Sequence, residues 1–233
     1  MSCKKLQVQT QNSPITNGES AIMLAGSLAS NSNGLVTLTT DLSSSSQSLY
    51  SNAGGCGVIH NDSVDHQSAV GSATTCNFKY KITNKLNCNS NKLPDNVSSS
   101  LSFSGNYNGS QMSANGGGNT SVTVAGLTPT STSYVINGTF KSVTNFKLKP
   151  DTTRSGTIAI NITIKNLTIS KPTVHMPAMI TSGNATATIT GNSPKGAFLF
   201  DGTITFTGFN EAVLTLGGTS YAVNLTTGAI TKK

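Results

Sequence analysis

The sequence contains few charged residues. Asp, Glu, Lys and Arg together make up 10% of the 233 residues, whereas an average soluble protein has about 25%. Ser, Thr and Asn instead supply more than a third of the chain, so the surface must be largely uncharged and rich in hydroxyl and amide groups. The length is sufficient for a substantial hydrophobic core without a structural metal.

Arginine is almost absent, because Arg154 is the only one among 15 basic residues. Guanidinium groups make the bidentate contacts to phosphate and guanine on which specific DNA recognition depends, so a nucleic-acid partner is not expected. The 8 acidic residues leave a net charge of +7. One interpretation of this excess positive charge is that the protein binds anionic partners such as lipid headgroups or acidic glycans. The alternative is that the lysines only keep an otherwise neutral surface soluble.

Side chains that carry catalysis are also scarce. The chain has 3 histidines, and it lacks both the G-x-S-x-G nucleophile motif and a phosphate-binding glycine loop. One group of possible ligands lies close together in sequence: Cys56, His60, Asp62, Asp65 and His66. On a straight strand, however, His60 and His66 would stand about 20 Å apart, too far for one ion. The sequence therefore predicts no enzyme, no metal site and no cofactor.

No run of apolar residues approaches the roughly 20 that a membrane-spanning helix needs. A chain so rich in Ser, Thr and Asn is expected outside the cytoplasm, and Met1 and Ser2 are interpreted as the remnant of a replaced signal peptide. Cys3 would then begin the mature chain, ahead of Lys4 and Lys5, as in a bacterial lipoprotein. The sequence thus predicts lipidation at Cys3, with an accidental surface thiol as the alternative.

Helical periodicity is almost absent, whereas apolar and polar residues alternate with period two along most of the chain. The expected strands include residues 20–28, 35–41, 56–70, 76–88, 99–107, 120–127, 132–148 and 180–190. About a dozen strands joined by short turns predict an all-β fold without substantial helix, either a single antiparallel β-sandwich or a flattened barrel. Residues 1–18 are expected to form a tether to the membrane, and residues 19–233 a single domain.

The C-terminal strands allow a more detailed prediction. Alternation continues through Asp201 and Gly202, so this pair is predicted to lie inside one long strand instead of forming a hairpin turn. A three-residue loop at 208–210 would then place Ile204 opposite Leu214 in the next strand.

The cysteines of the domain predict one disulfide. Cys76 and Cys88 lie in one uninterrupted strand, about 40 Å apart, so they cannot bond to each other. A turn at 71–73 would bring the preceding strand back so that Cys56 falls directly opposite Cys88. The expected bond is therefore Cys56–Cys88, with Cys76 free. A bulge near Asn61 would shift the register and favour Cys76 instead.

Short segments spread over most of the chain carry a family resemblance. They are "CKK", "GGCGVIHNDSV", "KLNCNSNKLP", "YVINGTFK", "TITIKNLTI", "SGNATATITG" and "DGTITFTGFNEAVLTLGGTSYAVNL". Together they resemble a family of uncharacterised Bacteroidota outer-membrane lipoproteins, which implies a lipid-anchored β domain on the cell surface or the periplasmic face. Under this resemblance, Ser63 in "DSV" and Thr152 in "DTT" match the O-glycosylation pattern of that phylum.

We therefore expect a non-enzymatic lipoprotein of the bacterial outer membrane, attached through Cys3. Its partner would be a glycan, anionic in view of the net charge, or another outer-membrane protein, and it could serve as an accessory part of an outer-membrane assembly. The alternative is a structural subunit whose edge strands pair with neighbouring copies to form a filament or coat.

Overall fold

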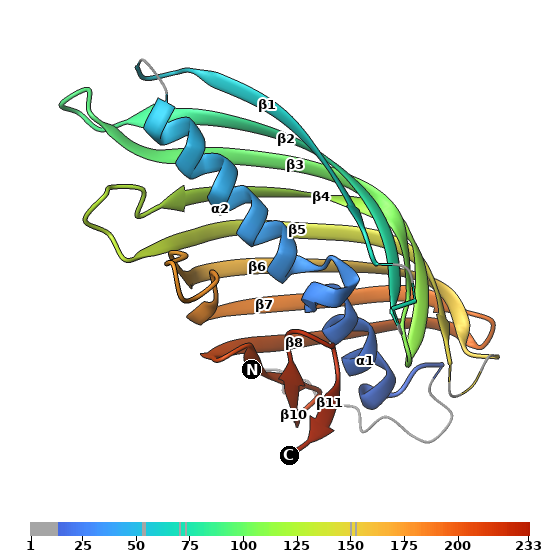
Figure 1. Cartoon of the computed structure of the whole chain (residues 1–233). Coiled ribbons are helices and arrows are strands. Elements are labelled where there is room, and N and C mark those ends of the chain that lie inside the picture. The colour runs from blue at the N-terminus through green and yellow to red at the C-terminus, as the bar shows by residue number, and fades with distance from the viewer. Residues whose placement is uncertain (1–13, 53–54, 70, 73, 150, 152) are drawn as a thin grey trace, which may run out of the picture.

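The chain folds around one large antiparallel sheet. The computed structural model describes residues 14–52, 55–69, 71–72, 74–149, 151 and 153–233. Two α-helices, α1 (Asn17–Leu28) and α2 (Leu35–Asn52), precede the strands and are linked by a short 3-10 helix, η1 (Ser30–Ser32). The sheet is strongly curved, and the helices lie across its concave face (Figure 1).

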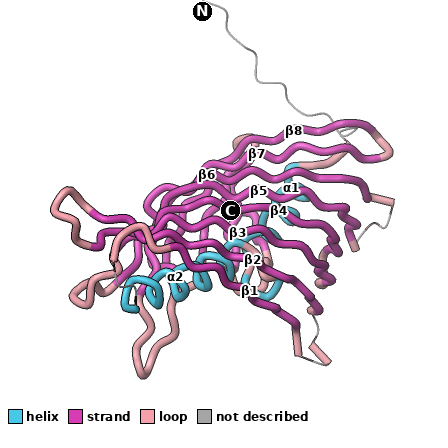
Figure 2. The backbone as a smooth tube through the Cα atoms, turned by 90° about the horizontal axis from the view of Figure 1, so that it is seen from above, coloured by secondary structure: helices cyan, strands magenta, loops and turns pink. Residues whose placement is uncertain are grey.

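The sheet has 11 strands in sequential order, each paired with its neighbours along the chain. They are β1 (Ile59–Gln67), β2 (Thr75–Cys88), β3 (Pro94–Asn108), β4 (Met112–Ala125), β5 (Ser133–Leu148), β6 (Ser155–Ser170), β7 (Ile180–Ser193), β8 (Gly196–Gly208), β9 (Glu211–Leu216), β10 (Thr219–Asn224) and β11 (Ile230–Lys232). Figure 2 shows from above how β1 to β8 follow one another across the sheet.

Because consecutive strands are antiparallel, their connections alternate between the two ends of the sheet. One end holds the connections β3–β4, β5–β6 and β7–β8 and contains Arg154; we call it the Arg154 end. The opposite end holds β2–β3, β4–β5, β6–β7 and β8–β9 and contains Lys92; we call it the Lys92 end. In Figure 1 the Arg154 end is on the right and the Lys92 end is on the left.

The predicted all-β class is confirmed. The sheet does not close, and β1 and β11 form its two edges. Its concave face is apolar and its convex face polar, as β2 illustrates with buried Tyr80 and Ile82 beside exposed Lys79 and Lys81. An apolar sheet face must be covered, and here the helices provide the second layer that a sandwich would take from another sheet.

The C-terminal prediction is also confirmed. Asp201 and Gly202 lie inside β8, and Ile204 pairs with Leu214 of β9.

Residues 20–28 and 35–41 were predicted as strands, and this is wrong: they belong to α1 and α2. At the start of α1, Thr16 and Glu19 form a capping box, in which each side chain accepts a hydrogen bond from the backbone of the other. In α2, Leu35, Leu38 and Leu42 follow helical spacing and are buried. Both signals are present in the sequence, but short apolar runs separated by Ser and Thr also match a strand pattern.

The hydroxyl-rich α2 can be buried because its own backbone satisfies its hydroxyl groups. Thr39 Oγ1 donates to the Leu35 carbonyl at 2.8 Å, and Ser43 Oγ donates to the Thr39 carbonyl at 2.7 Å. Such bonds offset the cost of removing a hydroxyl from water. A contact between Ser46 Oγ and Ser99 Oγ at 3.2 Å joins the helix to β3.

The domain begins earlier than the predicted boundary between residues 18 and 19. Ile15 is fully buried, and the Pro14 carbonyl accepts a hydrogen bond from Arg154 Nη1 at 2.7 Å. Arg154 Nε also lies 3.0 Å from Glu19 Oε1. Residues 14–18 therefore belong to the fold and not to the tether predicted over residues 1–18. Cys3 lies outside the described residues.

Candidate functional site

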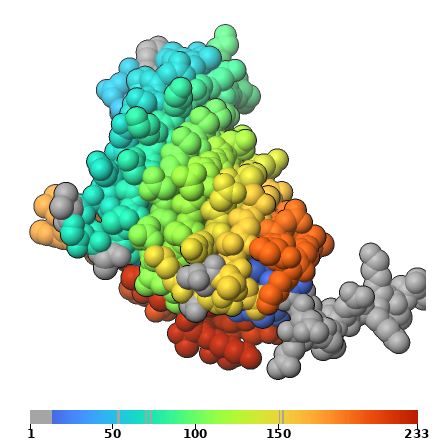
Figure 3. Space-filling model, turned by 90° about the vertical axis from the view of Figure 1, so that its right-hand side faces the viewer, coloured from blue at the N-terminus to red at the C-terminus, as the bar shows by residue number. Residues whose placement is uncertain are grey.

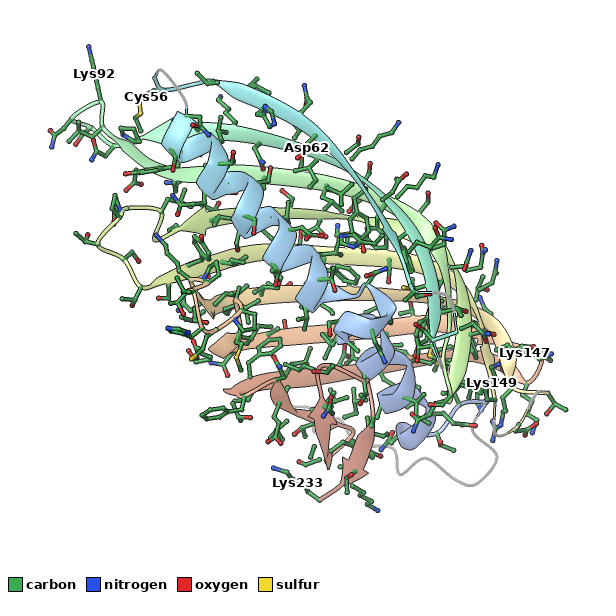
Figure 4. The ribbon with its side chains drawn as sticks, viewed as in Figure 1. Cys56, Asp62, Lys92, Lys147, Lys149 and Lys233 are labelled. Carbon is green, nitrogen blue, oxygen red and sulfur yellow. A yellow bond between two sulfur atoms is a disulfide. The ribbon has the colours of Figure 1, made fainter. Side chains whose placement is uncertain are left out.

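The cysteines of the domain are arranged as predicted. Cys56 and Cys88 form a disulfide with Cα atoms 5.6 Å apart, and Cys76 is free and buried. The register that led to the prediction is present, since Val64 pairs with Tyr80. The bond lies at the Lys92 end, where Figure 4 shows Cys56 near Lys92.

The possible ligands on β1 do not converge. His60 and Asp62 are exposed, whereas His66 Nε2 lies 2.7 Å from Asp41 Oδ2 of α2. Within the described ranges, no group of three or more His, Cys, Asp or Glu side chains could hold a metal ion. Of the two predicted glycosylation sites, Ser63 is exposed on β1, and Thr152 lies outside the described residues.

Cys76 and His66 both line an open polar hollow near the start of β2, but the thiol is poorly suited to catalysis. Cys76 is 7% exposed, and burial raises its pKa. Only the thiolate is an effective nucleophile, so Cys76 stays protonated at neutral pH. Its sulfur accepts a hydrogen bond from Asn33 Nδ2 at 3.0 Å, which makes it part of the packing between η1 and β2.

The Asp41–His66 contact predicts a pH dependence of stability. Burial raises the pKa of the Asp41 carboxyl above its usual value, although His66 acts in the opposite direction. Because the folded state favours the protonated carboxyl, Asp41 contributes its full stability below the pKa that it has in the unfolded chain. This contribution is lost as the pH rises through the pKa of Asp41 in the folded state. We therefore expect Asp41→Asn, which stays uncharged, to gain stability relative to the natural chain between about pH 3 and pH 7.

Urea unfolding of both proteins at several pH values measures this difference. A stability advantage of Asp41→Asn that shrinks toward neutral pH would show that pairing with His66 outweighs burial.

An apolar cavity lies between α1 and the concave face of the sheet, and we call it the α1 cavity. The volume available to the centre of a water-sized molecule is about 50 Å³, and all the empty space, including the part open to solvent, is about 500 Å³. The helical segment lines it with Met23, Gly26, Ser27, Ser32, Asn33 and Gly34, and the sheet lines it with Phe78, Phe103, Tyr107, Met112, Ala114, Phe140, Ser142, Thr144, Ile158 and Ile160.

The cavity is lined by stacked aromatic rings and by adaptable methionine side chains. On the sheet, Phe103 and Phe140 stack with their ring centroids 5.6 Å apart. Opposite them, Gly26 carries no side chain, and a Cβ atom there would lie 3.3 Å from Met112 Sδ. Methionine side chains such as Met23 and Met112 adapt readily to different shapes. The glycine thus allows Met112 to pack close to the backbone of α1.

The α1 cavity is suited to binding an apolar group and not to chemistry. Its lining contains no Asp, Glu, Lys, Arg or His, and burial raises the pKa of its one phenol, that of Tyr107. The smaller of the two volumes, about 50 Å³, exceeds the roughly 10–15 Å³ that one water molecule needs. It is below the roughly 300–1,000 Å³ of typical ligand sites, so a longer ligand requires the methionines or α1 to move.

The convex face carries a continuous row of hydroxyl groups. Thr83, Ser100, Ser121, Thr139, Thr163, Thr186, Thr203, Thr215 and Ser220 are successive cross-strand partners from β2 to β10. Neighbouring strands are about 4.8 Å apart, so the row presents evenly spaced donors and acceptors that match a hydroxyl-rich partner such as a glycan. Sequence reasoning missed this row because it depends on eight strand registers together.

Comparison with known proteins identifies no relative. No protein-family model, curated protein or solved structure matches the chain. Within the described part of the chain, neither helix has the length and apolar character that crossing a bilayer requires.

Proposed function

We propose that the chain is a non-enzymatic lipoprotein of the bacterial outer membrane, anchored through Cys3, that binds the apolar part of an envelope component in the α1 cavity. The observation that carries the binding role is the cavity itself, an apolar space without ionisable carboxylates, amines or imidazoles under a short helix. An acyl chain of an envelope lipid, glycolipid or lipoprotein has the matching chemistry.

The cysteines support the proposed anchor. The fold uses Cys56 and Cys88 in a disulfide and buries Cys76, so none of these three is free for an anchor, whereas Cys3 lies outside the described residues. It precedes Lys4 and Lys5, which suit an anionic membrane surface. The resemblance to Bacteroidota lipoproteins stays a prediction.

A glycan partner is a second candidate, and the hydroxyl row on the convex face favours it.

A filament or coat built by edge-strand pairing is less favoured. β1 is an edge strand, but it carries Asp62, Asp65 and His60. Charged side chains on an edge oppose pairing with another copy. Size-exclusion chromatography of the domain would reveal self-association.

Filling the α1 cavity is expected to abolish binding of an apolar probe. Ala114 lines the cavity, so Ala114→Phe would place a ring where the probe binds. We expect the fluorescent probe 1-N-phenylnaphthylamine to bind the natural chain and to bind Ala114→Phe at least about tenfold more weakly, which corresponds to about 1.4 kcal/mol. Fluorescence titration measures both affinities.

Ala197→Phe is the matched control, because Ala197 is exposed on β8 and the same ring there leaves the cavity unchanged. Circular dichroism verifies that both variants fold. If Ala114→Phe does not fold, Met23→Ala, which enlarges the cavity, must bind the probe more tightly. Equal affinity of the natural chain and Ala114→Phe would refute the site.

A further inference from the structure

The chain enters the domain at the Arg154 end. Arg154 is the last residue of the β5–β6 connection, and it contacts Pro14 and Glu19 at 2.7 Å and 3.0 Å. Seen from that end in Figure 3, the blue start of the chain lies beside the yellow and orange connections β5–β6 and β7–β8. Pro14, the first described residue, therefore lies at this end.

The Arg154 end carries more positive than negative charge. Lys147, Lys149 and Lys195 are exposed, and within the described ranges none of the three forms an ion pair. Figure 4 shows Lys147 and Lys149 projecting from this end. Of the two acidic residues near them, Glu19 lies against Arg154, and Asp151 lies near the positive charges of both Arg154 and Lys195. In the described part of the chain, Lys147 and Lys149 are thus left without an acidic neighbour, and Lys195 is compensated only in part by Asp151.

The Lys92 end has a different character. There the basic residues Lys92 and Lys171 are balanced by the acidic residues Asp95 and Glu211. Its connections also expose large apolar side chains, namely Leu93 (59%), Val174 (96%), Met176 (56%) and Phe209 (89%). Among the described residues, the connections at the Arg154 end expose no such side chain.

The length of the N-terminal segment bears on which end can face the membrane. From residue 3 to residue 14 the chain has 11 steps, which span at most about 40 Å when fully extended. β5 alone has 16 residues, and a straight strand of that length spans about 50 Å. The curved β5 is shorter from end to end than a straight strand, so the Lys92 end lies near the limit of a fully extended tether, whereas residue 14 already lies at the Arg154 end.

We infer that the domain stands on the membrane with its Arg154 end, where Lys147, Lys149 and Lys195 contact anionic headgroups. The inference rests on the proposed anchoring at Cys3, and it deepens that proposal by assigning the surface and the lipid class. The apolar side chains of the Lys92 end then point away from the membrane.

Vesicle binding of the full chain without its lipid tests the surface separately from the anchor. We expect Cys3→Ser to cosediment with vesicles of phosphatidylglycerol and phosphatidylcholine, and not with phosphatidylcholine alone, at low ionic strength. Adding Lys147→Glu, Lys149→Glu and Lys195→Glu should weaken this binding at least about tenfold.

A matched triple variant with the same change of net charge replaces Lys81, Lys85 and Lys165 by Glu, at exposed positions on the convex face. It should retain affinity within about threefold. Equal losses in the two triple variants, or no binding by Cys3→Ser, would overturn the inferred surface.

Mass spectrometry of the native protein separates the two proposals. An acylated Cys3 together with failed vesicle binding would defeat the surface alone, and an unmodified Cys3 together with specific vesicle binding would defeat the anchor alone.

Discussion

Leu42→Ala is expected to lower the free energy of unfolding by about 2 to 5 kcal/mol. Leu42 is fully buried in α2, on the face that packs against the concave side of the sheet. Truncation of the side chain leaves a cavity between the helix and the sheet. The neighbouring strands are fixed by their backbone hydrogen bonds to one another, so they cannot move inward to fill it. Denaturant unfolding followed by circular dichroism measures the loss.

Ser44→Ala provides the control, because Ser44 is exposed on the same helix and should change stability by no more than about 0.5 kcal/mol. If Leu42→Ala were as mild as Ser44→Ala, α2 would not be the layer that covers the apolar face.

Removing the disulfide is expected to cost about 3 to 4 kcal/mol. Cys56 and Cys88 are 32 residues apart in sequence, and in the chain-entropy model a loop of this length strongly restricts the unfolded state. The double variant Cys56→Ser, Cys88→Ser should therefore unfold at lower denaturant concentration than the oxidised natural chain.

A reducing agent supplies the control for the disulfide. It should destabilise the natural chain to the level of the double variant and leave the double variant unchanged. Non-reducing peptide mapping should join Cys56 to Cys88. A peptide linking Cys56 to Cys76 would contradict the register of β1 and β2.

The strands could be predicted because an exposed convex face and a covered concave face impose strict alternation. In β2 this alternation, combined with the spacing of Cys56, Cys76 and Cys88, was sufficient to predict both the register and the disulfide. The row of hydroxyls was not predicted. To recognise a row that crosses the strands, the register of every strand pair must be known, whereas alternation can be recognised within a single strand.

The helices were missed for a physical reason. Thr and Ser in α2 are weak helix formers in isolation, and the helix is stabilised by packing of Leu35, Leu38 and Leu42 against a sheet that follows later in the chain. Local sequence does not contain that partner. The capping box of Thr16 and Glu19 was the one local signal that could have revealed α1.

The candidate site was missed as a consequence. The α1 cavity combines α1 and η1 with residues of β2 to β6, so it could not be foreseen once α1 was assigned as a strand. Likewise, Lys147, Lys149 and Lys195 lie at the same end of the sheet only because the connections between successive antiparallel strands alternate between its two ends. This arrangement cannot be seen in any single strand.

Photolabelling tests most directly whether the α1 cavity is the binding site. A fatty acid carrying a diazirine near its methyl end is irradiated with the full chain, and labelled peptides are identified by mass spectrometry. We expect the label on α1 around Met23 and on inner positions of β4 and β5 such as Met112 and Phe140, with competition by unmodified fatty acid. Labelling confined to the exposed apolar side chains of the Lys92 end, such as Phe209, would contradict the proposed site.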